Sequence, residues 1–122
     1  MEIGLHGQDH IDWRHADDAV LSAELVDARD ALADVVGKAI TTLAIPFGAY
    51  NRRVMRRLAR SDFKRIYTSD TGLARRHDRF ARRNPVMAWH GATDVEAIID
   101  DEVSLARRVR RSIAPFIKRT FR

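Results

Sequence analysis

Two histidines four residues apart, His6 and His10, lie near the start of the chain in the stretch EIGLHGQDHIDW. Imidazole is a preferred ligand of zinc and other divalent cations, so a His-x-x-x-His pair is a candidate metal site. Glycines on either side leave room for a ligand against the backbone. Asp9, Asp12 and Trp13 add polar partners that could orient an imidazole and a ring that could shield the ion.

A second stretch, AIPFGAYNRRVMRRL, carries a proline, an aromatic residue and a glycine at an expected strand-to-helix turn. These are Pro46, Phe47 and Gly48, and Tyr50 follows closely. The histidine pair also follows an expected strand. Because the turns after parallel strands lie at one edge of a sheet, we expect the histidines and residues 46–48 to face a common site.

The elements that must position these residues can be inferred from apolar periodicity. EIGLH is expected to be the end of a short strand with Ile3 and Leu5 on one face, followed by a loop. Asp17 or Asp18 is a candidate helix cap, and Gly37 a helix end. The expected apolar stripe of that helix is Leu21, Leu25, Ala28, Leu32 and Val35.

Further along, AITTLAI predicts a buried strand that Pro46 ends. Asn51 is expected to cap a second helix, and FKRIYTS is the next predicted strand. The apolar residues that this helix should turn inward are Val54, Met55 and Leu58.

The last third of the chain is less regular. Residues 71–84 are expected to form a loop, and PVMAW one more short strand. Thr93 and Glu96 have the spacing of a capping box before a final helix. Strands alternating with helices predict an α/β fold with mostly parallel strands.

The composition is that of a globular domain. The chain has 122 residues, of which 45% are hydrophobic and 32% charged, and it has no cysteine, which excludes disulfides and thiolate metal sites. No apolar run approaches the roughly 18 residues of a membrane span, and no signal peptide is evident. A cytoplasmic location is therefore the default expectation.

Charge is unevenly distributed along the chain. Residues 1–50 hold 3 basic and 9 acidic side chains, whereas residues 51–122 hold 19 basic and 8 acidic ones. A basic half of this kind could meet phosphate, nucleic acid or an anionic surface. A solvated, arginine-rich face is the simpler interpretation, and we favour it.

Together, EIGLHGQDHIDW and LAIPFGAYNRRVMRRLARSDFKRIYTSDTG resemble the histidine motif and the proline-aromatic-glycine motif of the polysaccharide deacetylase family. The helix between them, LSAELVDARDALADVVGK, also matches, so that the resemblance covers roughly residues 2–85. It implies part of an incomplete (β/α) barrel. It also implies metal-dependent removal of acetyl groups from an acetylated polysaccharide or oligosaccharide.

The resemblance implies roles for individual residues. His6 and His10 correspond to the two histidine ligands of a divalent metal, often zinc, and the backbone N–H of Phe47 to the donor that meets the developing oxyanion. The late histidine that acts as an acid in the family has only His90 as a weak candidate here. The residues expected to bind the substrate are Pro46, Phe47, Gly48, Tyr50 and Trp13.

The sequence departs from the family in its carboxylates. The aspartate pair that supplies a metal ligand and the general base lies upstream of the histidines in the family, and Asp9 and Asp12 cannot take that role by homology. Ala44 also stands where some members have arginine. We therefore expect that the chain begins inside the domain, that its metal site is incomplete, and that its activity alone is weak or absent.

Two units are expected, namely a partial deacetylase domain over residues 1–92 and an amphipathic basic helical tail over residues 93–122. An open sheet edge would favour a second copy or a partner chain, and the tail could lie on an anionic membrane. The alternative function is a non-catalytic carbohydrate-binding or assembly module. A basic membrane or nucleic-acid adaptor is a third possibility, and nucleic acid is the less favoured partner.

Overall fold

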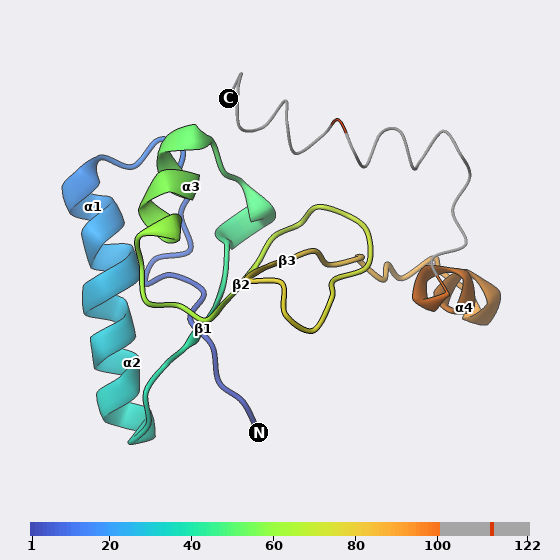
Figure 1. Ribbon diagram of the computed structural model, residues 1–122, viewed down its shortest axis with the longest axis horizontal. Coiled ribbons are helices and arrows are strands. Elements are labelled where there is room, and N and C mark those ends of the chain that lie inside the picture. The colour runs from blue at the N-terminus through green and yellow to red at the C-terminus, as the bar shows by residue number, and fades with distance from the viewer. Residues whose placement is uncertain (101–112, 114–122) are drawn as a thin grey trace.

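The computed structural model describes residues 1–100 and residue 113 (Figure 1). A long helical rod and a shorter helix lie beside a small sheet, and a further helix lies apart. The elements are α1 (Asp18–Ser22), η1 (Ala23–Asp27), α2 (Ala28–Val36), β1 (Thr42–Ala44), η2 (Pro46–Gly48), α3 (Arg52–Ala59), β2 (Arg65–Tyr67), β3 (Phe80–Ala81) and α4 (Ala92–Ile99).

The sheet has the order β1-β2-β3, and both pairings are parallel. This confirms the α/β class, while the incomplete barrel stays a prediction. The strand expected at EIGLH is reduced to a single parallel bridge between Leu5 and Leu43. Leu5 is buried as expected, whereas Ile3 is 37% exposed.

The first helix begins and ends where the sequence indicates. The side chain of Asp17 accepts a hydrogen bond from Val20 N, and Gly37 ends the helix in the left-handed region with φ of 68°. The expected stripe is wrong at its last position, because Val35 is 86% exposed and Val36 packs on the core instead. Val36 lies four residues after Leu32, which also packs on the core, so these two side chains share one face of the helix.

Two expectations for the last third of the described chain are wrong. Residues 80–81 form β3 inside the segment that was expected to be a loop, because Ile66 N and Thr68 N donate to the carbonyls of Arg79 and Ala81. PVMAW forms no strand, and its end is a turn closed by a hydrogen bond from His90 N to Met87 O.

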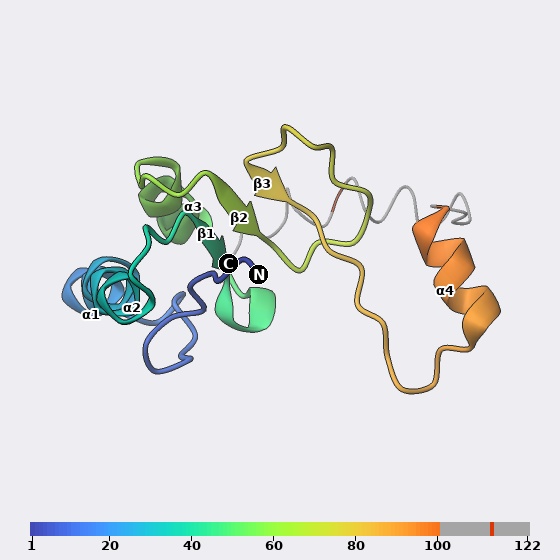
Figure 2. The same ribbon diagram turned by 90° about the horizontal axis from the view of Figure 1, so that it is seen from below.

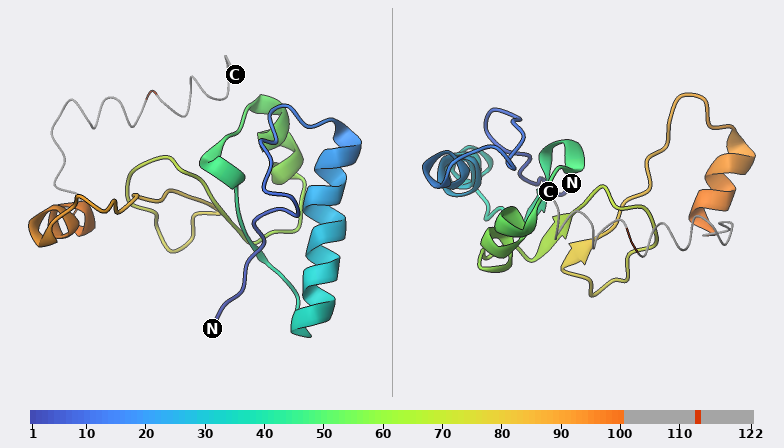
Figure 3. Two further views of the ribbon diagram at one scale, coloured as in Figure 1. Left: turned by 180° about the vertical axis from the view of Figure 1, so that it is seen from behind. Right: turned by 90° about the horizontal axis from the view of Figure 1, so that it is seen from above.

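The last described helix, α4, is capped differently from the expected capping box. Gly91, and not Thr93, is the N-cap, and its N–H donates to Asp94 Oδ2 at 2.8 Å. No residue of α4 is buried. The helix lies apart from the sheet and from α1–α3 in every view (Figures 2 and 3). Most of the expected basic tail lies outside the described residues.

The core lies between helices α1–α3 and the sheet face that carries Leu43 and Ile66. Val54 and Leu58 of α3 are buried in it, and Met55 packs at its margin, as the sequence predicts. None of the helices in the described residues combines the length and apolar character needed to cross a membrane. The side chains of the core are Leu5, Trp13, Leu21, Leu25, Ala28, Ile40, Leu43, Ile45, Tyr50, Val54, Leu58, Phe63 and Ile66.

Arg79, just before β3, ties this strand to the C-terminal end of α3. Its guanidinium donates to the carbonyl oxygens of Phe63 at 2.9 Å, Ala59 at 2.9 Å and Leu58 at 3.1 Å, and also to that of Ser61. The last carbonyls of a helix have no partner within the helix, so a cation there satisfies them and opposes the helix dipole.

We therefore predict that Arg79→Ala lowers the free energy of unfolding by about 2 kcal/mol, the scale of hydrogen bonds to a charged group. The exposed Arg82 offers a matched control, and Arg82→Ala should change this free energy by less than about 0.5 kcal/mol. Urea denaturation of both variants measures the difference. Equal losses in the two variants would contradict this assignment.

Candidate metal and saccharide site

The histidine pair lies in the loop that follows the Leu5 bridge. His6 Nδ1 is 2.8 Å from the carbonyl oxygen of Ala44, at the end of β1. A carbonyl can only accept, so Nδ1 carries the proton, and in the neutral ring Nε2 has a free lone pair. The ring of His10 lies 4.8 Å from that of His6, centroid to centroid. Two imidazoles are thus adjacent, and one is held in the tautomer that metal ligands use.

The turn of residues 46–48 meets this loop. The rings of His10 and Phe47 are 4.3 Å apart, centroid to centroid. His10 and Phe47 both have positive φ, 52° and 55°, and they are the only non-glycine residues of the described chain that do. Such a backbone conformation costs about 1–3 kcal/mol per residue and is concentrated at functional sites.

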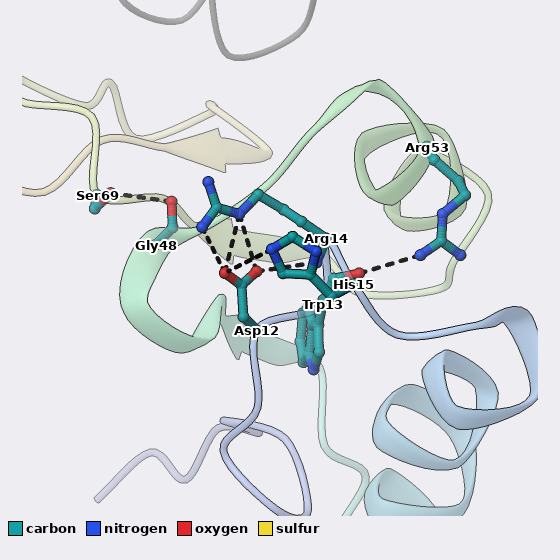
Figure 4. A network of polar contacts seen from close by, with 7 residues as sticks. All are labelled: Asp12, Trp13, Arg14, His15, Gly48, Arg53 and Ser69. Atoms are coloured by element: carbon teal, nitrogen blue, oxygen red, sulfur yellow. Dashed lines mark hydrogen bonds and ion pairs between the residues drawn. The ribbon is translucent and has the colours of Figure 1, made fainter. Parts of the chain in front are cut away.

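Gly48 allows the turn to approach the end of β2. Its φ is 59°, and a Cβ built on it would lie 1.9 Å from Ser69 Oγ. Ser69 Oγ instead donates to the carbonyl of Gly48 at 3.2 Å (Figure 4). Within the turn, the N–H of Gly48 donates to the carbonyl of Ile45, and the N–H of Ala49 donates to the carbonyl of Pro46. For the Phe47 amide, no acceptor lies among the residues that the structure describes.

Beside the turn lies an open cavity of about 460 Å³. Tyr50 forms part of its wall although the side chain is only 1% exposed, and its hydroxyl donates to Asp70 Oδ2 at 2.5 Å. Phe47 is 65% exposed at the rim. The lining residues are Asp12, Arg14, Phe47, Gly48, Ala49, Tyr50 and Ser69.

Charge in this cavity comes from Asp12 and Arg14. Arg14 Nε and Nη2 donate to the Asp12 carboxylate at 2.5–3.0 Å, and His15 lies 3.9 Å from the same carboxylate (Figure 4). The hydrogen bond from Arg14 holds the pKa of Asp12 below its ordinary value, against the opposing effect of burial. The same bond raises the pKa of Arg14. The cavity therefore holds a neutralised ion pair.

Comparison with known proteins assigns the chain that carries this site to a family. The family model described as polysaccharide deacetylase matches residues 1–66, more than half of the chain. The chain belongs to the polysaccharide deacetylase family. No curated protein matches it. The matched range contains both the histidine loop and the 46–48 turn.

Within this deacetylase-family chain, the histidine pair and the 46–48 turn are brought together as expected, but Trp13 is placed differently from the expectation. Its side chain is fully buried, and Nε1 donates to Glu24 at 3.1 Å, so the ring supports the loop from beneath and offers no surface to a saccharide. Arg53 of α3 fixes the same segment by donating to the carbonyl of Trp13 (Figure 4) and to that of Ala16.

His90 is not brought to the histidine pair. Its Nδ1 lies 3.2 Å from Met87 N, and its ring has an edge contact with Trp89. The segment between β3 and α4, which contains it, runs away from the 46–48 turn (Figure 2). Its contacts in the described chain are therefore local.

Three site residues were not identified from the sequence, namely Ser69, Asp70 and Glu24. Ser69 and Asp70 lie two and three residues after the end of β2, so their position at the strand end of a parallel sheet was an available signal. Glu24 gave no comparable signal, because an acidic residue on a surface helix is ordinarily solvated.

The donor chemistry fits a divalent cation in part. His6 and His10 are neighbouring nitrogen donors, and the bond from His6 to Ala44 is the outer-sphere support that histidine ligands commonly have. Among residues 1–100 and 113, no three His, Asp or Glu side chains are grouped so that they could share an ion.

Gly48 and Gly37 provide a test of the turn. Both have positive φ, but a Cβ at Gly37 meets nothing within 4 Å. We predict that Gly37→Ala costs about 1 kcal/mol of unfolding free energy from backbone strain, and Gly48→Ala about 3 kcal/mol because the clash with Ser69 is added. Urea denaturation measures both values. Similar losses of unfolding free energy in the two variants would contradict the prediction, because they would mean that Ser69 moves aside at little cost.

The Asp12 pair predicts a pH dependence. Since the folded-state pKa lies below its ordinary value of 3.8, the ionised pair stabilises the fold at higher pH, and this contribution is lost as the pH falls through the folded-state pKa. The stability advantage of the wild type over Asp12→Asn should be constant above about pH 5 and shrink in acid. The Arg14→Met variant should likewise lack this pH-dependent stabilisation, because its Asp12 carboxylate has lost the arginine partner. Urea denaturation from pH 2 to pH 7 measures it, and an advantage that persists at pH 2 would contradict the prediction.

Proposed function

We propose that this chain takes part in hydrolytic deacetylation of an acetylated polysaccharide or oligosaccharide, with a divalent metal, zinc in the first instance, held by His6 and His10. The observation that supports this most directly is the contact between the His10 and Phe47 rings. It brings the candidate metal ligands against the 46–48 turn, and the residue on each side of the contact has a strained backbone.

When bound, a divalent cation supplies Lewis-acid polarisation of the acetyl carbonyl and a water of lowered pKa. The roles left to the chain are binding and orientation. His6 Nε2 and the His10 ring bind the ion, and the Ala44 carbonyl fixes the His6 tautomer. The Phe47 amide, without an acceptor among the described residues, donates to the developing oxyanion.

The saccharide, in this proposal, occupies the cavity beside the turn. Phe47 offers it an exposed apolar ring face, and the Asp12–Arg14 pair offers hydrogen-bonding groups of both kinds. Tyr50 lines the wall, and its hydroxyl is already bonded to Asp70. An open cavity with one exposed ring and several polar groups suits a sugar unit.

We propose further that the described residues alone support only weak catalysis. Catalytic zinc ordinarily keeps three protein ligands, and two imidazoles are grouped here. A positioned general base typically contributes 10²–10⁴-fold, and no carboxylate is grouped with both histidines in the described chain. The lack of a carboxylate grouped with both histidines in the described chain also favours a second candidate function, a carbohydrate-binding module without catalytic activity.

Zinc titration by calorimetry tests the metal ligands. We predict that His6→Ala and His10→Ala each weaken zinc binding by tenfold or more, because each removes one of two donors. The exposed His77, remote in sequence from the pair, is the control, and His77→Ala should leave the affinity unchanged. Equal affinity in wild type and His6→Ala would refute the site.

Acetate release from an acetylated chitooligosaccharide with added zinc or cobalt tests the reaction. We expect slow release that His6→Ala abolishes. Binding of the oligosaccharide without release would favour the binding module. Release that continues without metal and survives His6→Ala would overturn the proposed deacetylation.

A further inference from the structure

Glu24 is an acidic side chain buried beneath the histidine loop. It lies in η1 and is only 1% exposed. Its Oε2 accepts hydrogen bonds from Gln8 N at 3.0 Å and Trp13 Nε1 at 3.1 Å, and its Oε1 accepts one from Asp9 N at 2.9 Å. Both of its oxygens are therefore bonded.

The two backbone donors lie between His6 and His10. Gln8 and Asp9 are central residues of the His-x-x-x-His loop, so the carboxylate holds the backbone that joins the two imidazoles. A buried carboxylate is costly unless donors surround it, and the cost of breaking such an arrangement is correspondingly high. The loop conformation and the burial of Glu24 thus depend on each other.

Gly7 and η1 are adapted to this carboxylate. Gly7 has φ of 81°, and a Cβ built on it would lie 2.4 Å from Glu24 Oε2. Glu24 and Leu25 are consecutive and both buried, within the π-helical segment. Insertion of such a wide turn into an α-helix is frequent at functional sites.

We propose that Glu24 is a positioning residue for the metal ligands. By holding the backbone of residues 8–9 it keeps the rings of His6 and His10 adjacent, at 4.8 Å, before any ion binds. This inference rests on the proposed metal function. Glu24 is not grouped with the two histidines as a third ion ligand, and its oxygens accept from three N–H donors beneath the loop.

The test uses Glu24→Gln, which keeps the size of the side chain. An amide has one oxygen, so it can keep the bonds to Gln8 and Trp13 only by turning its NH₂ group toward the Asp9 N–H. We expect zinc affinity to fall about tenfold or more, the scale found when partners of metal ligands are removed. Calorimetric titration of the whole chain measures it.

Leu25→Ala is the matched control, since Leu25 is buried in the same helical segment but packs in the apolar core. It should destabilise the fold and leave zinc affinity within about twofold of the wild type. Hydrogen exchange in the metal-free protein gives a second readout. Urea is added so that the two variants have the same free energy of unfolding. Under these conditions the amide hydrogen of Asp9 should exchange at least about tenfold faster in Glu24→Gln than in Leu25→Ala.

The two readouts separate the possible failures. Wild-type zinc affinity in Glu24→Gln, or an equal loss of affinity in Leu25→Ala, would overturn the positioning role while the metal site stands. A wild-type chain that binds no zinc would overturn the proposed function. In that case the exchange rates still decide whether Glu24 holds the loop, and unchanged rates would show that it does not.

Discussion

The geometry of the candidate site depends first on one buried carboxylate. Glu24 collects two backbone N–H groups and one indole N–H, and so fixes the histidine loop to the helical rod that packs on the sheet. Each donor would otherwise need a partner beneath a loop that excludes water. The interaction also explains two local features, the glycine at position 7 and the complete burial of Trp13.

The second constraint is the parallel sheet, which brings three chain segments to one edge. Leu5 pairs with β1, so the loop after it and the turn after β1 leave the sheet on the same side. The side chain of Ser69, two residues after the end of β2, donates to the carbonyl oxygen of Gly48 in the turn. Residues far apart in sequence are thereby placed around one cavity, although no strand in the described part of the chain has more than three residues.

Local features of this fold were predictable from the sequence, whereas long-range partners were not. Asp17, Gly37 and Asn51 were identified correctly because capping depends on residues three or four positions away. The alternation of strands and helices predicted that the histidine loop and the 46–48 turn would face each other. The two-residue β3, the capping of α3 by Arg79 and the burial of Glu24 each depend on contacts that periodicity does not encode.

The strain at His10 and Phe47 shows how the site is organised. Neither residue favours a positive φ, so contacts elsewhere must offset the cost, and the chain supplies them through Glu24 on one side and the Gly48–Ser69 contact on the other. In many small zinc domains the metal itself orders the loop that binds it. Here buried contacts of the protein hold the loop and the turn. For the proposed metal site we therefore expect affinity to be limited by the number of donors and little by the cost of ordering them.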